Sequence, residues 1–291
     1  MKIVFYTSGI EGSGRLVRGI AIGNALKRKK INCDFIIINS SSFTHLCDQL
    51  DVRHIEIPVE NEIQLSKEKY IDSILYKTII ELNPDILIVD LLWFSLYHFI
   101  DELKCKKVFI CHQVYNNFFS IKLLEGELQF NEKQYDLQLA IEPFHSKIQL
   151  TNINPIILRN KDEILSREDS LAKLKLDSSR DVCLYAFNNR PGDFDKYRKK
   201  YSYLENEYQM VYTSNYSGGL FPIIDYFNAF DFIVCAAGYN QFWEIIYFNK
   251  DAVFEHVPLK FSSTEKRYLE CSDYQFDENG ADQLVDTILN L

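Results

Sequence analysis

One segment near the start of the chain has the residue types of an anion-binding loop. Ser8-Gly9-Ile10-Glu11-Gly12-Ser13-Gly14-Arg15-Leu16-Val17-Arg18 follows a short apolar run. Glycines allow a tight turn and let a ligand approach the backbone N–H groups at the start of a helix. The segment is not a dinucleotide-binding loop: it lacks the third glycine, and the second apolar run leads into Asn39-Ser40-Ser41 rather than an acidic residue. The alternative is a turn that only permits close helix packing.

A second such segment lies late in the chain, at Cys235-Ala236-Ala237-Gly238-Tyr239-Asn240-Gln241-Phe242-Trp243-Glu244. The small residues give a strand end that a ligand can approach, and the free amides of Gly238 to Gln241 would face an anion. Glu244 lies about one and a half turns into the expected helix, on the face that can turn back toward the strand ends. Its carboxylate could accept hydrogen bonds from two hydroxyls, as a ribose requires. The alternative is an ordinary surface residue.

The elements that must position these segments alternate between short apolar runs and longer amphipathic stretches. In the first half we expect strands at 2–6, 34–38, 54–57, 86–89, 107–111 and 137–141, and helices at 15–29, 42–50, 66–82, 94–103 and 121–133. In the second half we expect strands at 182–187, 208–212, 232–235 and 252–254, and helices at 166–174, 193–204, 223–229, 239–248, 262–271 and 281–290.

This alternation predicts parallel sheets covered by helices on both faces, with functional loops at the carboxyl ends of the strands. Asn152, Asn154 and Pro155 interrupt the pattern. We therefore expect two doubly wound, Rossmann-like α/β domains, residues 1–155 and 156–291, that face each other across a ligand cleft.

Composition excludes several classes of function. With 32 Lys and Arg against 41 Asp and Glu, the formal charge is −9, which argues against a nucleic-acid partner. The seven cysteines are scattered without a C-x-x-C pair, which indicates a reducing compartment with no disulfide framework and no metal site. The longest apolar stretch, residues 86–100, contains Asp90 and is too short to span a bilayer. We expect a cytoplasmic protein, with peripheral membrane contact left open.

The two loops together resemble those of glycosyltransferase-B enzymes, in particular the peptidoglycan N-acetylglucosaminyltransferase and related predicted bacterial glycosyltransferases. The resemblance is carried by G-x-G-x-x-x-R at 12–18 and by A-A-G-Y-N-x-x-x-E at 236–244. Asn83-Pro84-Asp85-Ile86-Leu87-Ile88-Val89-Asp90 is similar to a strand of that family's first domain, and Asn154-Pro155-Ile156-Ile157-Leu158-Arg159 to its domain junction.

The resemblance implies that the second domain holds a nucleotide-sugar donor and the first domain the acceptor. Arg159 would neutralise the charge of the departing diphosphate, so that neither metal nor cofactor is needed, and Glu265 and Arg267 lie where related chains contact the donor sugar. The loop with Asn189 and Arg190 would form a second wall of the donor pocket. Implied donor-binding residues are Arg159, Asn189, Arg190, Gly238, Tyr239, Asn240, Gln241 and Glu244, and the implied acceptor or phosphate loop comprises Gly12, Ser13, Gly14, Arg15 and Arg18.

One position departs from the family. Arg15 stands where the family commonly has a histidine that can act as base, and a guanidinium cannot deprotonate an alcohol. Glu11 in the same loop, Asp90 at a strand end and His112 just after a strand are alternative bases. Arg15 could instead bind an anionic acceptor, such as a carboxylated sugar or a lipid phosphate.

Three functions are compatible with these observations. The favoured one is a metal-independent glycosyltransferase that moves a sugar from a nucleoside-diphosphate sugar, with UDP the expected nucleotide, to a sugar or lipid-linked acceptor hydroxyl in bacterial cell-surface glycan synthesis. Inversion at the sugar follows only from the resemblance. The alternatives are a nucleotide-sugar hydrolase similar to that of pseudaminic acid synthesis, and a non-catalytic sugar-nucleotide-binding subunit.

Overall fold

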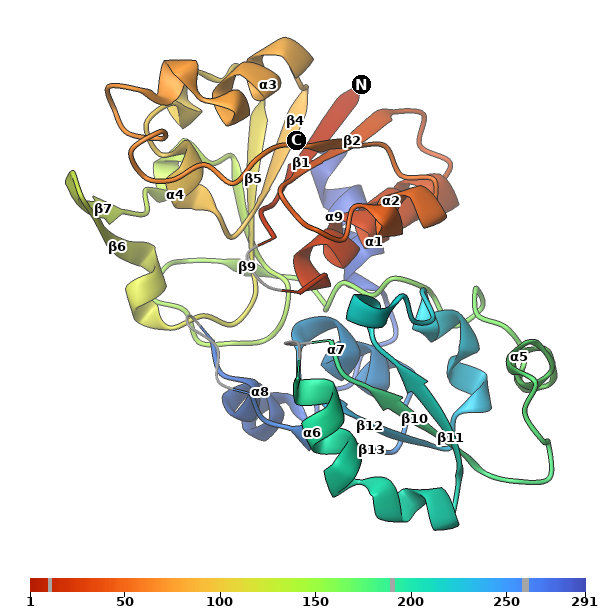
Figure 1. Cartoon of the computed structure of the whole chain (residues 1–291). Coiled ribbons are helices and arrows are strands. Elements are labelled where there is room, and N and C mark those ends of the chain that lie inside the picture. Colours follow the sequence, from red (N-terminus) through yellow and green to blue (C-terminus); the bar gives the residue numbers. More distant parts are fainter. Residues whose placement is uncertain (10–11, 189–191, 258–261) are drawn as a thin grey trace.

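Each half of the chain is built around a parallel β-sheet (Figure 1). The structure is a computed structural model that describes residues 1–9, 12–188, 192–257 and 262–291. The first sheet has the strand order β3-β2-β1-β4-β5-β8-β9 and the second has the order β11-β10-β12-β13. In both, the chain reverses its direction of growth across the sheet, which places the ends of neighbouring strands beside a crevice.

The first half contains the following elements: β1 (Lys2–Tyr6), α1 (Gly14–Arg28), β2 (Asp34–Asn39), α2 (His45–Gln49), β3 (His54–Glu56), α3 (Ile74–Leu82), β4 (Ile86–Asp90), α4 (Trp93–Leu96), β5 (Lys106–Cys111), β6 (Ser120–Leu123), β7 (Gly126–Gln129), β8 (Leu137–Ala140) and β9 (Thr151–Asn152). Strands β1, β4 and β5 are nearly continuous apolar runs because helices or loops cover both faces of their sheet.

The second half contains α5 (Arg167–Leu174), β10 (Val182–Ala186), α6 (Asp193–Lys200), β11 (Gln209–Thr213), β12 (Phe232–Ala236), α7 (Tyr239–Tyr247), β13 (Ala252–Glu255), α8 (Thr264–Cys271) and α9 (Gly280–Ile288). Short 3₁₀ turns connect many elements of the chain; they lie at Tyr70–Asp72, Ile100–Glu102, Asn116–Phe119, Glu132–Gln134, Ser202–Asn206, Asn215–Ser217 and Ile223–Ala229.

Several expected helices are shorter than the hydrophobic pattern suggested. The helix expected at 66–82 begins only at Ile74, because the Ser73 hydroxyl accepts a hydrogen bond from the Tyr76 amide and caps it there. The helix expected at 94–103 breaks into α4 and a 3₁₀ turn, and the helix expected at 193–204 ends at Lys200.

The helix expected at 121–133 was a wrong prediction. The segment forms an antiparallel hairpin of β6 and β7, in which Ile121 pairs with Leu128 and Leu123 with Gly126. Ile121 and Leu123 alternate with polar residues, and Gly126 adopts a positive φ of 127° that a helix does not allow. Spacing of apolar residues over so short a run fits either a helix or a strand.

The last helix crosses back to the first half of the chain. In Figure 1, α9 lies beside α1 and away from the sheet of its own half. Arg28 donates to Asp282 at 2.8 Å and Lys29 to Asp286 at 2.8 Å, which joins the end of α1 to α9. The boundary predicted between residues 155 and 156 stays a prediction, and α9 packs against α1 of the first half.

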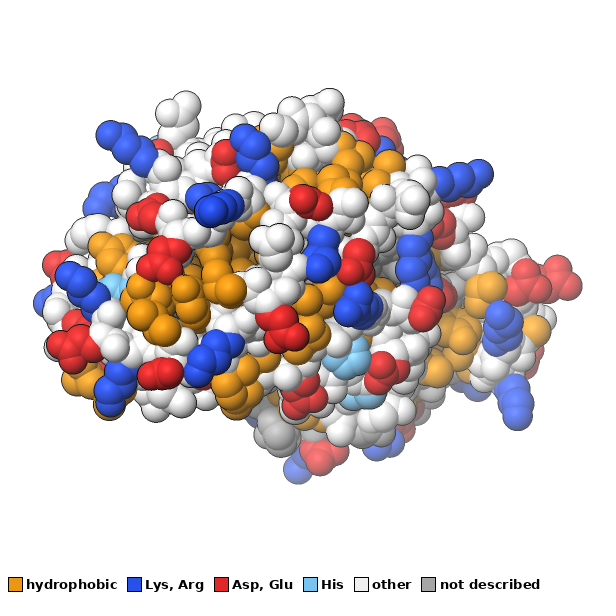
Figure 2. Space-filling view, turned by 90° about the horizontal axis from the view of Figure 1, so that it is seen from above, with side chains coloured by type: hydrophobic (Ala, Val, Ile, Leu, Met, Phe, Trp, Pro, Cys, Tyr) orange, Lys and Arg blue, Asp and Glu red, His pale blue; other side chains and the backbone are white. Residues whose placement is uncertain are grey.

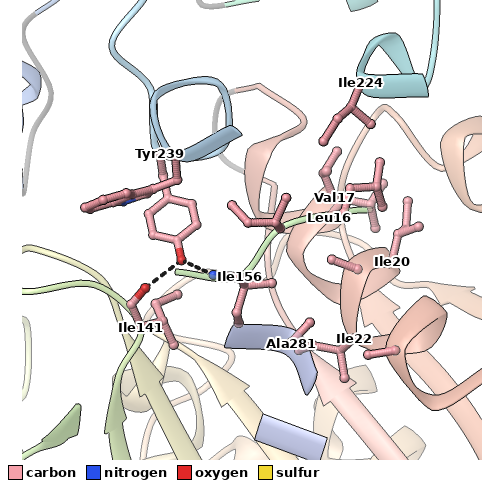
Figure 3. Packing of buried hydrophobic residues seen from close by; sticks show 14 of the residues in the cluster. Leu16, Val17, Ile20, Ile22, Ile141, Ile156, Ile224, Tyr239 and Ala281 are labelled. Carbon is pink, nitrogen blue, oxygen red and sulfur yellow. Dashed lines mark hydrogen bonds between the residues drawn. The ribbon is translucent and has the colours of Figure 1, made fainter. Parts of the chain in front are cut away.

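A single apolar cluster runs through both domains. Figure 3 shows Leu16, Val17 and Ile20 of α1 in this cluster, together with Ile156 of the connecting segment and Ala281 of α9. Each of these side chains is almost fully buried. Since α1 carries the first candidate loop at its N-terminus, this packing fixes where that loop lies relative to the second domain.

The surface carries charges of both signs mixed with apolar areas, as Figure 2 shows for the face seen from above. Several large apolar side chains of the first domain are strongly exposed, among them Val59, Ile63 and Leu124. In the described parts of the chain, none of the helices has the length and apolar character needed to cross a membrane.

Candidate functional site

The first candidate loop leads from β1 into α1. Gly12 adopts a φ of 69°, a left-handed conformation that favours glycine, and Ser13 is the N-cap residue of α1. The Ser13 side chain makes no capping hydrogen bond to the helix, and the first turn contains no acidic residue. The N–H groups of that turn therefore remain available to a ligand. Glu11, one of the predicted bases, lies outside the described residues.

The second candidate loop leads from β12 into α7 in the same way. Gly238 is the N-cap residue of α7, with an extended backbone and no side chain to satisfy the first amides of the helix. A Cβ atom built on Gly238 would meet no atom within 4 Å, so the space in front of this helix end is open. The backbone N–H groups of Tyr239, Asn240 and Gln241 can thus face an anion with the positive end of α7 behind them.

Two asparagines bring the loops together across the domain boundary. Asn240 donates through Nδ2 to the carbonyl oxygen of Gly14 at 3.0 Å. Asn215 donates through Nδ2 to the Ser13 hydroxyl at 2.7 Å, and its backbone N–H donates to Oδ1 of Asn188 at 2.6 Å. The starts of α1 and α7 therefore lie against one another, as expected for loops at the carboxyl ends of two facing sheets.

A cavity of about 380 Å³ lies at this junction. Its polar lining includes Arg15, Arg18, His112, Gln241 and Glu244, and its apolar lining includes Leu158, Phe221, Pro222, Ile223 and Ile224. A mostly apolar cleft with a few convergent polar groups is the usual form of a small-molecule site. The residues predicted at 12–18 and 238–244 are brought together here.

Glu244 extends from α7 into this cavity. The residue is only 5% exposed, and burial, with a smaller contribution from Asp225, raises the pKa of its carboxyl group to about 8. No described side chain ion-pairs with it within 4 Å. Burial thus favours the protonated form of Glu244, because a buried carboxylate without a charge partner is costly unless hydrogen-bond donors reach it. Two hydroxyl groups of a ligand that donate to Glu244 would stabilise its charged form.

Tyr239 has a structural role that its position in the loop did not indicate. Its hydroxyl donates to the carbonyl oxygen of Ile141 at 2.7 Å and accepts from the amide of Ile156 at 2.9 Å (Figure 3). Ile141 follows β8 of the first domain, and Ile156 lies in the segment that links the domains. The predicted contact between Tyr239 and phosphate therefore falls to its backbone amide, because the single proton of its hydroxyl is already donated to Ile141.

Asp90, a predicted base, is placed as an ion-pair partner. It is fully buried, and Arg18 donates through Nη2 to both of its carboxylate oxygens, at 2.9 and 2.8 Å. Protonation of Asp90 would leave a buried guanidinium without its counter-charge, which is strongly unfavourable. The structure thus favours Asp90 as the group that holds Arg18 at the cleft and disfavours it as the base.

His112 has the geometry that a base needs. Its Nδ1 lies 2.8 Å from the carbonyl oxygen of Gln113, and because a carbonyl can only accept, Nδ1 carries the proton. The lone pair is then on Nε2. Burial holds the pKa of His112 well below its usual range, with Arg18, Arg267 and Arg15 adding to the effect. The ring is therefore neutral at neutral pH, which leaves Nε2 able to accept a hydrogen bond, while burial and the three arginines oppose the protonated ring.

Arg159 lies outside the set of described residues that line the cavity. Its guanidinium donates to Asp225 through Nε at 2.8 Å. Its predicted contact with a diphosphate stays a prediction. Asn189 and Arg190, predicted in a second wall of the donor pocket, lie outside the described residues, although the neighbouring Asn188 does line the cavity.

Glu142 was not predicted as a site residue, yet it binds groups from both domains at their junction. This fully buried carboxylate accepts from Arg267 Nε at 2.8 Å, from Trp243 Nε1 at 2.5 Å and from the Gln113 amide at 2.6 Å. Arg267, expected near the donor sugar, is 1% exposed and paired here instead. Glu142 therefore joins the segment that follows β5 in the first domain to α7 and α8 of the second.

Comparisons with known proteins point to one fold. No family model matches this chain, and no curated protein matches it by sequence. Among solved structures, the spinosyn forosaminyltransferase SpnP has a TM-score of 0.63 at 11% identity, over 100% of this chain and 90% of that one. The spinosyn rhamnosyltransferase SpnG, complexed with thymidine diphosphate, has a TM-score of 0.60 at 11% identity, over 100% and 92%. Acinetobacter baumannii MurG has a TM-score of 0.51 at 11% identity, over 100% and 91%.

The chain has the glycosyltransferase-B fold. This confirms the predicted fold class of two Rossmann-like domains. It also confirms that the predicted resemblance to glycosyltransferase-B enzymes holds for the fold. Within a glycosyltransferase-B fold, the loops at the starts of α1 and α7 lie at the crevice between the two sheets, which is where the cavity is found.

Proposed function

We propose that this chain is a glycosyltransferase that moves a sugar from a nucleoside-diphosphate sugar, with UDP the expected nucleotide, to a hydroxyl group of a sugar or lipid-linked acceptor. The fold supports the proposal, since SpnP and SpnG, which share it, are named as sugar transferases. A fold alone does not define a function, and the residues of the interdomain cavity provide the more specific support.

The observation that carries the proposal is the carboxyl group of Glu244 in the interdomain cavity. It is buried without a charge partner among the described residues, and it follows the open N-terminus of α7 by about one and a half turns. A nucleoside diphosphate presents an anion and a pair of ribose hydroxyls at a comparable separation. The α7 amides would bind the diphosphate and Glu244 the ribose.

In the proposed reaction, a neighbouring acceptor oxygen attacks the anomeric carbon from the face opposite the diphosphate. The bond from that carbon to the diphosphate oxygen breaks, and its electron pair leaves with the diphosphate. The amides at the start of α7 stabilise the charge that develops on the leaving group, so that the reaction is proposed to need no metal. Attack from the opposite face gives inversion.

The acceptor hydroxyl must lose its proton during this attack, and His112 is our proposed base. Its Nε2 is unprotonated, it lines the cavity, and it comes from the first domain, opposite α7. Positioned bases of this kind typically contribute about 10²- to 10⁴-fold to a rate. Of the three alternative bases, we prefer His112 to Asp90, which is ion-paired with Arg18.

The cellular setting is also a proposal. We propose a cytoplasmic enzyme of bacterial cell-surface glycan synthesis that contacts the inner face of the membrane peripherally. The strongly exposed apolar side chains Val59, Ile63 and Leu124 support such a contact.

The proposal is tested by binding of nucleotides to the purified full chain. Thermal shift and calorimetry with UDP, GDP, dTDP and CMP would be carried out on the wild type, on Glu244→Ala and on the matched control Glu81→Ala, since Glu81 is exposed on α3 of the first domain. A nucleotide at a hundred times its dissociation constant should add about 2.7 kcal/mol to the free energy of unfolding. We expect one nucleoside diphosphate to stabilise the wild type and the control, and Glu244→Ala to lose the effect.

Turnover then separates transfer from hydrolysis. The sugar derivative of the nucleotide that binds would be incubated with and without candidate acceptors, and release of nucleoside diphosphate measured. Release that requires an acceptor supports the transferase, whereas equal release in water alone shows a hydrolase. If no nucleotide stabilises the wild type, the proposal fails.

A further inference from the structure

Arginines around the cleft differ in one respect, namely whether a carboxylate neutralises them. Arg18 pairs with Asp90, Arg159 with Asp225 and Arg267 with Glu142, each with a nitrogen-to-oxygen distance of 2.8 Å. Arg15 has no such partner among the described residues. Within the described parts of the chain it makes a single hydrogen bond, from Nη1 to the carbonyl oxygen of Ser8 at 3.2 Å.

The side chain of Arg15 nevertheless lies in a place where a bare cation is unfavourable. It is half-buried and lines the cavity of about 380 Å³. Burial lowers the pKa of its guanidinium, and repulsion from Arg18 adds to this, although Asp90 opposes it. Burial has removed part of the water around the guanidinium. An anion bound here would replace that lost hydration with charge-assisted hydrogen bonds.

The N-terminus of α1 adds positive electrostatic potential at the guanidinium of Arg15. Arg15 is in the first turn of α1, a helix of 15 residues whose N-terminus has neither a side-chain cap nor an acidic residue. The helix dipole therefore adds to the charge of the guanidinium. A guanidinium also offers two parallel N–H groups, a geometry that matches two oxygens of a carboxylate or phosphate.

We infer that Arg15 binds an anionic group, a carboxylate or a phosphate, carried by the acceptor. The inference rests on the proposed function, because it takes the cleft face of the first domain as the acceptor side. Arg15 and His112 line one cavity, so an acceptor anchored by its anion at Arg15 can present a hydroxyl to Nε2 of His112. The enzyme would then select charged acceptors over neutral ones of the same shape.

The experiment uses calorimetry on the full chain, with the wild type, Arg15→Gln, the conservative Arg15→Lys and the exposed control Arg180→Gln. Each protein is first titrated with the nucleoside diphosphate, and the saturated complex is then titrated with acceptor probes. Methyl glucoside and methyl glucuronide differ only in a carboxylate, glucose 6-phosphate carries a phosphate, and inorganic phosphate tests binding of the anion alone. Circular dichroism checks that every variant is folded.

We expect methyl glucuronide or glucose 6-phosphate to bind the wild type at least about tenfold more tightly than methyl glucoside. Arg15→Gln should abolish this preference, Arg15→Lys should keep part of it, and Arg180→Gln should leave it unchanged. Tighter binding of glucose 6-phosphate than of methyl glucuronide identifies the anion as a phosphate, and the reverse order identifies a carboxylate. Inorganic phosphate that binds as tightly as the sugar phosphate would place a free-anion site at Arg15 and overturn the acceptor role.

Two further outcomes would overturn the inference and leave the proposed function intact. One is equal binding of charged and neutral probes by the wild type while the nucleotide still binds. The other is weaker nucleotide binding by Arg15→Gln, which would assign Arg15 to the donor diphosphate. If the wild type binds no nucleotide, the proposed function fails, and with it the acceptor role of Arg15.

Discussion

The hydroxyl group of Tyr239 allows a quantitative test of how the two domains are joined. Tyr239→Phe removes one oxygen atom and leaves the ring in place. The centre of this ring lies 5.0 Å from Cζ of Arg18 and 5.8 Å from Cζ of Arg267. The buried amide of Ile156 and the buried carbonyl of Ile141 each lose their hydrogen-bond partner. The substitution therefore isolates two hydrogen bonds at the domain junction with almost no change in volume.

The expected cost follows from those two backbone groups. A buried donor or acceptor that is left unsatisfied costs about 1–3 kcal/mol. With partial relaxation of the linking segment, we expect Tyr239→Phe to lower the free energy of unfolding by about 2–4 kcal/mol. In a chain of 291 residues the midpoint of thermal unfolding should fall by roughly 3 to 7 °C.

The assay is equilibrium unfolding in urea, followed by far-UV circular dichroism and by tryptophan fluorescence, because Trp243 lies in the junction. Tyr203→Phe is the matched control, since Tyr203 is 57% exposed and should change stability by less than about 0.5 kcal/mol. Divergence of the two probes in the variant would show that the domains no longer unfold together. A loss for Tyr239→Phe as small as that of the control would refute the reasoning.

Three other predictions concern single residues. The pKa of Glu244 is raised to about 8 in the folded chain, against about 4.3 in an unfolded one, so between these pH values the folded state holds a proton that the unfolded state releases. The free energy of unfolding should therefore fall by up to about 1.4 kcal/mol per pH unit in this range. Urea unfolding from pH 5 to 8 should show a weaker dependence of this free energy on pH for Glu244→Gln than for the wild type. His112→Asn should lower kcat by about 10²- to 10⁴-fold while calorimetry shows unchanged nucleotide affinity; equal losses in both would argue against a base. Gly280→Ala would place a Cβ 1.8 Å from the Asn154 carbonyl oxygen and should cost about 3 kcal/mol or more in thermal unfolding, whereas Gly238→Ala, with open space, should keep the midpoint of the wild type.

Strand positions could be predicted closely because burial on both faces leaves a clear mark in the sequence. The run at Ile86–Asp90 is buried at every residue, and the expected strand differs from the observed one by a single residue. The hairpin at 120–129 could not be predicted in the same way, because one of its faces is exposed and its strands have only four residues each. In so short a segment, contacts made after folding decide between helix and strand.

The site was predictable where it depends on one stretch of chain and unpredictable where it depends on a pairing. The loops around Gly14 and Gly238 follow strands of parallel sheets, and topology alone brings such loops to a crevice. By contrast, Arg18 and Asp90 are 72 positions apart, and Arg267 and Glu142 are 125 apart. Nothing local to these residues indicates which cation neutralises which carboxylate, and this pairing is what separates Arg15 from the other arginines.

The return of α9 to the first domain has a consequence for how the chain folds during its synthesis. Leu284, Val285 and Ile288 of α9 are buried in the same apolar cluster as Leu16 and Ile20 of α1. The first domain leaves the ribosome early, but the helix that covers this apolar surface is made only after the second domain. Until then the α1 surface stays exposed, so a nascent chain arrested before residue 280 should be a better target for chaperones than the complete chain.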